Sequence, residues 1–113
     1  MHEAAIAENI LSIAERVSEQ EQIHQIQKVV LEIGQFSGVV PELLRIAFDI
    51  IKKNSILEDA ELEMLRPPLV LFCRTCSSEY LGDREDLRCP LCSGEKFEIV
   101  QGNKMLIKEI IGE

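Results

Sequence analysis

Four cysteines form two pairs late in the chain, and their spacing could hold a metal ion. Cys73 and Cys76 make one C-x-x-C pair, and Cys89 and Cys92 make the other, with twelve residues between the pairs. Two such turns can direct four thiolates at one centre, in the tetrahedral arrangement that zinc prefers. Soft thiolate ligands favour zinc or iron over magnesium or calcium. We therefore predict a four-cysteine metal site, with zinc as the expected ion.

Other interpretations of the cysteines stay open at this point. Rubredoxin-like iron uses a similar ligand set, so the spacing does not exclude iron. A redox dithiol needs only one C-x-x-C pair, and the presence of two argues against it. Four thiolates leave no open position for water, so the ion should be structural and should fold its own segment. Four basic residues could offset the negative charge of such a site or could simply face solvent: Arg74, Arg84, Arg88 and Lys96.

The second candidate site is the start of the chain, Met1-His2-Glu3. Only two histidines occur among 113 residues, and one of them is residue 2. The free amine, the main-chain nitrogens of His2 and Glu3 and the His2 imidazole could form adjoining chelate rings. Nitrogen donors of this kind suit Ni(II) and Cu(II), which accept a square-planar shell. The Glu3 carboxylate could be a ligand or could orient the imidazole. By itself this motif is weak, and His24, in a polar stretch, is expected to face solvent.

The charge distribution argues against a nucleic-acid partner. The net charge is −8, with −6 in residues 1–68, −2 in residues 69–100 and zero in residues 101–113. Binding to phosphates needs clustered Lys and Arg, and no segment is basic. The chain also starts without a basic region ahead of an apolar stretch, and no apolar run is long enough to cross a bilayer. We expect a cytoplasmic protein with no membrane contact, in which a reducing environment disfavours disulfides.

The elements that must position these sites form a short α/β pattern. Apolar residues at helical spacing predict helices over residues 4–20 and 41–53, and alternation predicts strands over 27–33, 60–66 and 104–111. The expected fold is α+β: a small three-stranded sheet with two helices, plus an inserted zinc-ribbon (rubredoxin-like) module. Residues 1–67 and 102–113 would form the nickel-binding α/β domain, and residues 68–101 the zinc module. Pro67-Pro68 and Gly102 could act as joints between the two parts.

Both helices carry an apolar surface that should face the interior. In the first helix the apolar stripe consists of Ile6, Ile10, Ile13 and Val17. Such a stripe is typical of a helix that packs on a core. The second helix is apolar nearly all round between residues 43 and 51, so it is either buried on several sides or offers a face to a partner. We favour burial.

Taken together, these features resemble the HypA/HybF family of nickel metallochaperones for NiFe-hydrogenase maturation. The resemblance covers the whole chain and rests on Met1-His2-Glu3, the amphipathic helix that follows, and the two cysteine pairs. It implies that His2 binds nickel beside main-chain nitrogens of Met1 and Glu3, and that the four cysteines hold structural zinc. It also implies work with the GTPase HypB, transfer of nickel to the hydrogenase large subunit, and for some relatives a role in urease. Family members occur as monomers and as homodimers.

One departure from the family pattern concerns the cysteine segment. Some relatives have histidines flanking the cysteine pairs, but residues 69–100 contain none here. A zinc site that exchanges cysteine for histidine ligands is therefore not expected. Three rival functions remain: a zinc ribbon that binds nucleic acid, an enzyme, and an adaptor protein in which zinc is structural and His2 has no function. No phosphate loop, Ser/His/Asp set or carboxylate pair supports the enzyme.

Overall fold

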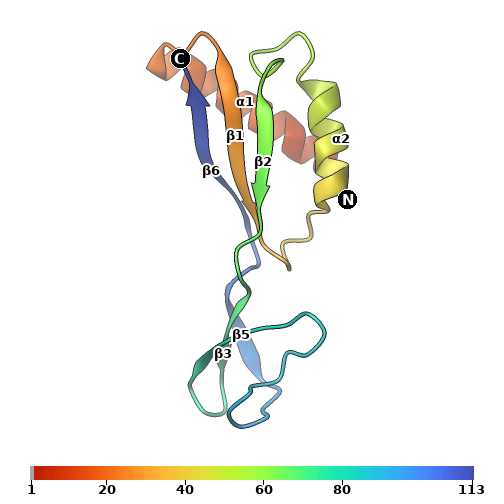
Figure 1. Cartoon of the computed structure of the whole chain (residues 1–113), viewed down its shortest axis with the longest axis vertical. Coiled ribbons are helices and arrows are strands. Elements are labelled where there is room, and N and C mark those ends of the chain that lie inside the picture. The colour runs from red at the N-terminus through yellow and green to blue at the C-terminus, as the bar shows by residue number, and fades with distance from the viewer. Residues whose placement is uncertain (1) are drawn as a thin grey trace.

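The structure, a computed structural model, describes residues 2–113, so the predicted main-chain role of Met1 lies outside the described residues. The molecule is elongated, with principal extents of 53 × 26 × 17 Å. Figure 1 shows a larger α/β part joined by a narrow waist to a small β part that holds the cysteines. The elements are α1 (Glu3–Glu21), β1 (Ile26–Ile33), α2 (Pro41–Ile51), β2 (Glu61–Leu65), β3 (Val70–Cys73), β4 (Glu79–Leu81), β5 (Phe97–Gln101) and β6 (Met105–Gly112).

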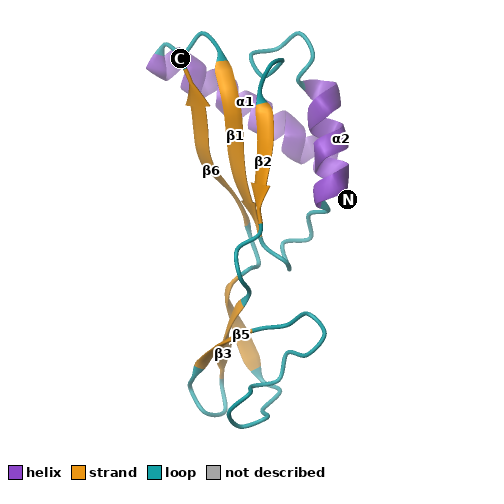
Figure 2. Ribbon diagram, viewed as in Figure 1, coloured by secondary structure: helices purple, strands orange, loops and turns teal. Residues whose placement is uncertain are grey.

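The main sheet has the strand order β2-β1-β6. β1 and β2 are parallel, so the chain must cross from one end of the sheet to the other between them, and α2 makes this crossing. β6 returns after the cysteine segment and pairs antiparallel with β1. Both helices lie on one face of the sheet (Figure 2). The prediction of a three-stranded sheet with two helices is confirmed.

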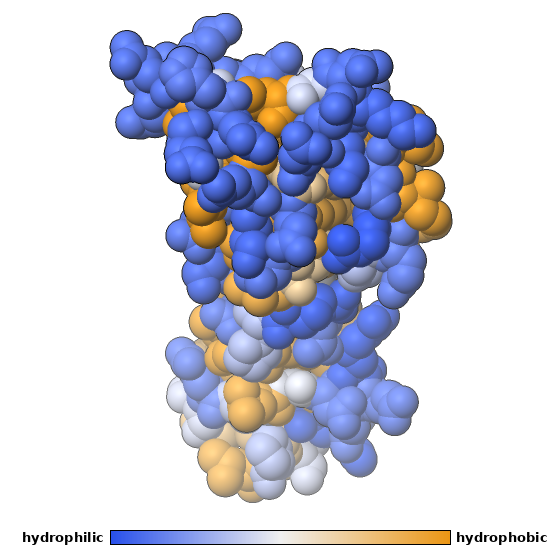
Figure 3. All heavy atoms as spheres, turned by 45° about the horizontal axis from the view of Figure 1, so that its top comes forward, coloured by the Kyte–Doolittle hydropathy of each residue, from blue (hydrophilic) through white to orange (hydrophobic). Residues whose placement is uncertain are grey.

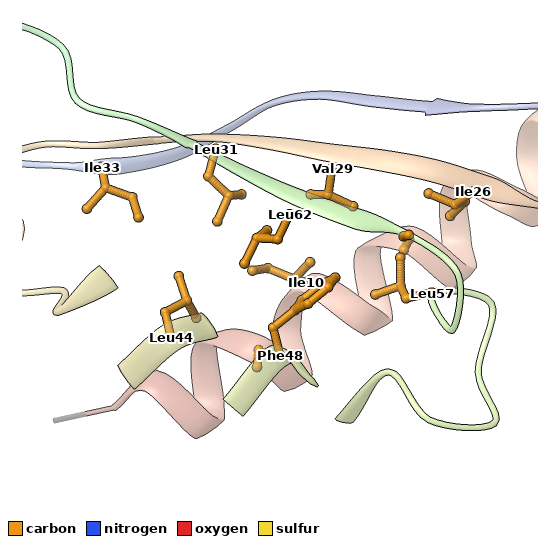
Figure 4. Packing of buried hydrophobic residues seen from close by; sticks show 12 residues of the cluster. Ile10, Ile26, Val29, Leu31, Ile33, Leu44, Phe48, Leu57 and Leu62 are labelled. Carbon is orange, nitrogen blue, oxygen red and sulfur yellow. The ribbon is translucent and has the colours of Figure 1, made fainter. Parts of the chain in front are cut away.

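An aliphatic core fills the space between the sheet and the helices. Figure 4 shows Leu31, Val29 and Leu62 on the sheet side facing Ile10 of α1 and Phe48 of α2. All but Leu62 are at most 1% exposed, and Leu62 is 6% exposed. The alternating apolar residues of the strands and the apolar residues at helical spacing in the helices therefore pack together in a single apolar layer.

The two helix surfaces differ from the sequence expectations. In α1 the most buried apolar residues are Ala7, Ile10 and Ala14, whereas Ile13 and Val17 are only half-buried. The small side chains of Ala7 and Ala14 allow α1 to pack closely against the sheet and α2. The helix face that carries them is therefore buried in place of the predicted isoleucine stripe. Ile10 alone of that stripe is fully buried.

The prediction that α2 is buried on several sides is wrong. Leu44 and Phe48 reach the core, but Leu43, Ile46 and Ile50 are 46%, 58% and 66% exposed. The sheet and α1 cover only one side of this helix, so the remaining apolar side faces solvent. Figure 3 shows apolar surface in orange at the right-hand edge, where α2 lies.

The small sheet has the order β4-β3-β5 and is antiparallel throughout. The sequence predicted a metal-binding insertion here but not its three strands. Its own apolar cluster contains Leu69, Leu71 and Tyr80 together with two of the cysteines. Phe36, from the loop between β1 and α2, also packs on this cluster. The α/β part thus contributes a side chain to the core of residues 68–101, hereafter the cysteine module.

Backbone hydrogen bonds connect the chain segments that form the waist between the two parts, at residues 34–36 and 102–104. The N–H of Gly34 donates to Lys104 O at 2.9 Å, and the N–H of Phe36 donates to Gly102 O at 2.7 Å. A Cβ atom at Gly34 would lie 2.3 Å from Gly102 O, so only glycine fits at this approach. Gly102 itself has φ +122°, a left-handed conformation that glycine adopts readily. The predicted joint at Gly102 is therefore packed and hydrogen-bonded.

Candidate metal centres

Two matching turns position the four cysteines. In the first turn the N–H of Ser77 donates to Cys73 O, and in the second the N–H of Ser93 donates to Cys89 O, both at 2.8 Å. Ser77 and Ser93 have φ of 61° and 60°, the left-handed region that closes such a turn. The N–H of the first cysteine in each pair also donates across its turn, to Ser78 O and Gly94 O respectively. Each C-x-x-C-S segment therefore folds into the same knuckle.

The two knuckles face one another and bring four sulfur atoms together. All four Sγ atoms lie within 4.8 Å of one another. The separations across the knuckles are 3.6 Å for Cys73–Cys92 and 3.7 Å for Cys76–Cys89. Sulfur atoms bound tetrahedrally at about 2.3 Å would be about 3.8 Å apart, whereas a disulfide needs about 2.05 Å. The four free cysteines thus fit a tetrahedral metal ion, and the prediction that they form one site is confirmed.

The surroundings of the four sulfur atoms shift the pKa values of two thiols in opposite directions. The N–H of Cys76, and then that of Thr75, stabilise the Cys73 thiolate and lower its pKa to about 6. At Cys92 the N–H of Gly94 favours the thiolate, but hydrogen bonding with Cys73 and burial outweigh it and raise the pKa to about 12. One thiol thus ionises easily while its neighbour resists a second charge nearby. A divalent cation removes this conflict by allowing all four thiolates to form.

Two of the four basic residues near the cysteines pair with carboxylates. Arg74 pairs with Glu98 at 2.6 Å, and Arg88 pairs with Asp86 at 3.0 Å. All four of these side chains are more than half exposed. Arg84 lies over the ring of Phe36 at 5.7 Å from its centroid. The suggestion that arginines balance the charge of the metal site therefore gains no support from Arg74, Arg84 or Arg88.

His2 stands at the cap position of α1, directly before its first turn. Its carbonyl accepts the N–H of Ile6 at 2.9 Å, and its side chain is exposed. The first N–H groups of a helix have no partner within that helix, so main-chain nitrogens beside the imidazole are not needed for helical hydrogen bonds. His24 is also exposed, as predicted, but it follows the far end of a 19-residue helix, about 28 Å along the helix axis.

Glu3 is the one buried charged residue of the described chain, at 5% exposure. Its Oε2 accepts the N–H of Val40, the cap residue of α2, at 3.0 Å. Hydrogen bonds from the chain's amino group and then from Val40 lower the pKa of the Glu3 carboxyl to about 2. The carboxylate therefore lies where the amino ends of two helices meet, and its charge suits the positive ends of both helix dipoles.

Two parts of these sites were not predicted from the sequence. The partner of Glu3 is the main chain of Val40, and a main-chain donor leaves no signal in residue types. The role of Ser77 had a signal, because serine follows both cysteine pairs. Serine is not a residue that marks a left-handed turn as glycine does, so this repetition carried no prediction.

Comparison with known proteins identifies the family to which these sites belong. A family model described as hydrogenase/urease nickel incorporation, metallochaperone, hypA matches residues 1–111. The chain belongs to the HypA family. The hydrogenase maturation factor HypA of Nostoc punctiforme is 36% identical and aligns over 97% of this chain and 94% of its own length. The HypA of Rhodopseudomonas palustris strain TIE-1 is 34% identical over 97% of both chains.

Solved structures of HypA proteins share the fold. The solution structure of the nickel metallochaperone HypA from Helicobacter pylori has a TM-score of 0.71 and 27% identity, over 99% of this chain and 97% of that one. A second HypA solution structure has a TM-score of 0.76 and 26% identity, over 100% and 97%. As a HypA-family member, the chain is a nickel metallochaperone of hydrogenase maturation with a four-cysteine metal site. Both the Nostoc punctiforme and the Rhodopseudomonas palustris relatives are named hydrogenase maturation factors. Among residues 2–113, no helix is long and apolar enough to cross a membrane.

Proposed function

We propose that the chain binds Ni(II) at its amino terminus and delivers it during hydrogenase maturation. The carrying observation is the placement of His2, whose exposed imidazole lies at the start of a helix that Glu3 fixes to the rest of the domain. The ligands would be the His2 imidazole and main-chain nitrogens of Met1, His2 and Glu3. A terminal site of this kind is reached without unfolding a core, which suits a metal that must be released.

For Glu3, the geometry favours a main-chain ligand over a carboxylate ligand. The carboxylate is buried and already accepts the N–H of Val40. Moving it onto nickel would break that hydrogen bond and leave the N–H of Val40 without this acceptor. In its present position the carboxylate would act through the orientation of the first turn, as an outer partner does in other metal sites.

For Cys73, Cys76, Cys89 and Cys92, we propose a structural zinc ion. When bound, zinc would hold the two knuckles together and compensate the repulsion among their thiolates. The closed set of four sulfur ligands leaves no position for a reacting molecule. Metal analysis tests the assignment: purified protein should contain zinc, and a red, iron-containing protein would contradict it.

The partners remain those that the family resemblance implies. They are the GTPase HypB and the hydrogenase large subunit as nickel acceptor, with urease as a further destination. Nickel would pass by ligand exchange at a docked interface. The exposed residues Leu43, Ile46 and Ile50 of α2 lie close to the first turn of α1 and give such an acceptor apolar surface beside the nickel site.

Acidification tests the ligand set. The amine, the imidazole and the amides must lose protons before they bind, so nickel affinity should fall as the solution is taken from about pH 8 to about pH 6. The measurement is a nickel titration of tag-free, zinc-loaded protein followed by ultraviolet–visible absorption. His24→Ala is the matched control and should show the same fall. An affinity that stays constant on acidification would contradict this ligand set.

A further inference from the structure

β6 is an edge of the main sheet, and within residues 2–113 no strand pairs with its outer side. An edge strand of eight residues presents N–H and C=O groups that can pair with another chain. The other edge, β2, has five residues, and both of its charged residues, Glu61 and Glu63, are exposed and acidic. Two copies of β2 would repel one another. β6 is therefore the edge that suits pairing with a second copy.

The side chains of β6 follow a pattern that is symmetric about its centre. Four positions are half-buried, namely Met105, Ile107, Ile110 and Gly112, and the first three of them pack on the core between the sheet and the helices. Four exposed residues occupy the remaining positions: Leu106, Lys108, Glu109 and Ile111. The pattern reads the same from either end because a bulge in the pairing with β1 places one extra residue between Ile107 and Glu109. Reversing the strand about its midpoint therefore keeps every side chain on its own face.

We propose that β6 joins two copies of this chain by antiparallel pairing about a twofold axis midway between Lys108 and Glu109. In this register Lys108 of each copy lies opposite Glu109 of the other, so two pairs of opposite charge form at the axis. Leu106 lies opposite Ile111 of the second copy on the exposed face, and these two side chains are 53% and 39% exposed in the single chain. The result is a continuous six-stranded sheet.

The bulge is compatible with this pairing. A bulge in one strand alone shifts the register by one residue and sends later side chains to the wrong face. Here both strands carry the same extra residue at the same place, so the two shifts match. Among the described residues, neither Lys108 nor Glu109 takes part in an ion pair within the chain. Both charges are thus available to the second copy.

An apolar groove along β6 provides a second argument for the same contact. It runs between α1 and β6. Its lining consists of Asn9, Ile13 and Val17 from α1 and Met105, Leu106, Ile107 and Ile110 from β6. Ile13 and Val17 belong to the helix stripe that the sequence assigned to the core, yet one chain leaves them half-buried. In the paired sheet, Ile107 and Ile110 of the second copy would lie at this groove and cover it. One contact thus accounts for both the edge strand and the incompletely buried stripe.

This dimer would leave the nickel terminus accessible. The first turn of α1 is tied to the start of α2 by the bond between Glu3 and Val40. Figure 1 places α2 beside β2, at the opposite side of the main sheet from β6. The exposed face of α2 also stays outside the β6 contact. The proposal is therefore independent of nickel binding and is tested without nickel.

A charge-exchange experiment tests the register. Sedimentation equilibrium of the full, zinc-loaded chain over a concentration series should show a monomer–dimer equilibrium. Lys108→Glu places two acidic residues opposite each other, and Glu109→Lys places two basic ones, so each should weaken dimerisation about tenfold or more. The double variant Lys108→Glu/Glu109→Lys restores opposite charges and should recover the parent's dimerisation. An equimolar mixture of the two single variants should do the same by forming mixed dimers.

Several results would overturn the proposal. A parent chain that stays monomeric throughout the series has no β6 contact, and single variants that dimerise as the parent does place the contact elsewhere. If the double variant and the mixture stay monomeric while circular dichroism shows parent-like folding, the register is wrong. Hydrogen exchange gives an independent readout: β6 amides should gain protection as concentration rises, while β2 amides should not. Equal changes in both strands would also refute the assignment.

Discussion

The carboxylate of Glu3 accepts a 3.0 Å hydrogen bond from the main-chain N–H of Val40, 37 residues further along the chain. This bond joins the first turn of α1 to the first turn of α2. Chain ends usually fray unless they are tied down. Here Glu3, the residue after His2, is tied to the start of α2. The proposed nickel site at the start of α1 would thereby gain a defined location while the His2 side chain stays exposed.

Glu3 substitutions separate anchoring from direct metal binding. Glu3→Ala removes the acceptor for Val40, so the melting temperature should fall and nickel affinity should weaken although His2 is intact. Glu3→Gln keeps an oxygen acceptor but loses the charge, so it should retain most of the nickel affinity. Isothermal titration and thermal unfolding of both variants make the comparison. Loss of nickel binding in Glu3→Gln, with a melting temperature no lower than that of Glu3→Ala, would assign the carboxylate as a ligand.

The stabilisation from Glu3 should depend on acid pH. Its pKa in the folded protein is about 2, below the ordinary value of 4.5, so protonation favours the unfolded chain. The contribution is complete above about pH 4.5 and is lost as the pH falls towards 2. Urea unfolding at a series of pH values should show the parent's advantage over Glu3→Gln shrinking across that range. A difference that does not change with pH would show that the charge of Glu3 does not stabilise the fold.

The chain offers a built-in probe for the cysteine module. Tyr80 is the only tyrosine, there is no tryptophan, and the Tyr80 hydroxyl donates to Leu87 O at 2.5 Å within the module. Cys73→Ala should abolish zinc binding and unfold this module, exposing Tyr80 while the helices persist. Arg74→Ala changes the neighbouring exposed residue and should keep zinc. Tyrosine fluorescence and zinc analysis follow both variants, and a Cys73→Ala protein with full zinc and a buried tyrosine would refute the four-cysteine site.

The waist should be sensitive to a single methyl group. Gly34→Ala puts a Cβ atom against the backbone oxygen of Gly102, so we expect a loss of about 1–3 kcal/mol in the free energy of unfolding. Gly82→Ala is the comparison, because its Cβ would meet side-chain atoms of the buried Leu69 and Leu71 and not backbone, so a smaller loss is expected. Urea unfolding measures both. Equal and negligible losses would mean that the waist is a loose joint, as the sequence suggested for Gly102.

The sequence was informative where one residue type has one dominant use. Two C-x-x-C pairs in one short segment have few other uses, so the metal site was predicted with all four ligands. Alternating and helical apolar patterns likewise gave five of the elements within one or two residues of their ends. The three strands of the cysteine module were missed because they are short, and the cysteines interrupt their alternation.

Exposure and long-range contacts were harder to predict. An apolar helix has the same pattern whether its second side is covered by the same chain or by another, which is why the exposure of Ile46 and Ile50 was not foreseen. The contact of Glu3 with Val40 depends on how two helices pack. The register of β6 against β1, with its bulge, is likewise set by the sheet and not by local residue preferences.

Nickel titration of tag-free, zinc-loaded protein is the most direct test of the central claim. Four chains are compared: the parent, His2→Ala, a variant with one residue added before Met1, and His24→Ala as control. We predict that the parent and His24→Ala each bind nickel with the absorption bands of nitrogen ligation, and that both altered termini lose this binding. If all four chains bind nickel alike, the metal lies elsewhere, and the start of the chain is only the first turn of a helix.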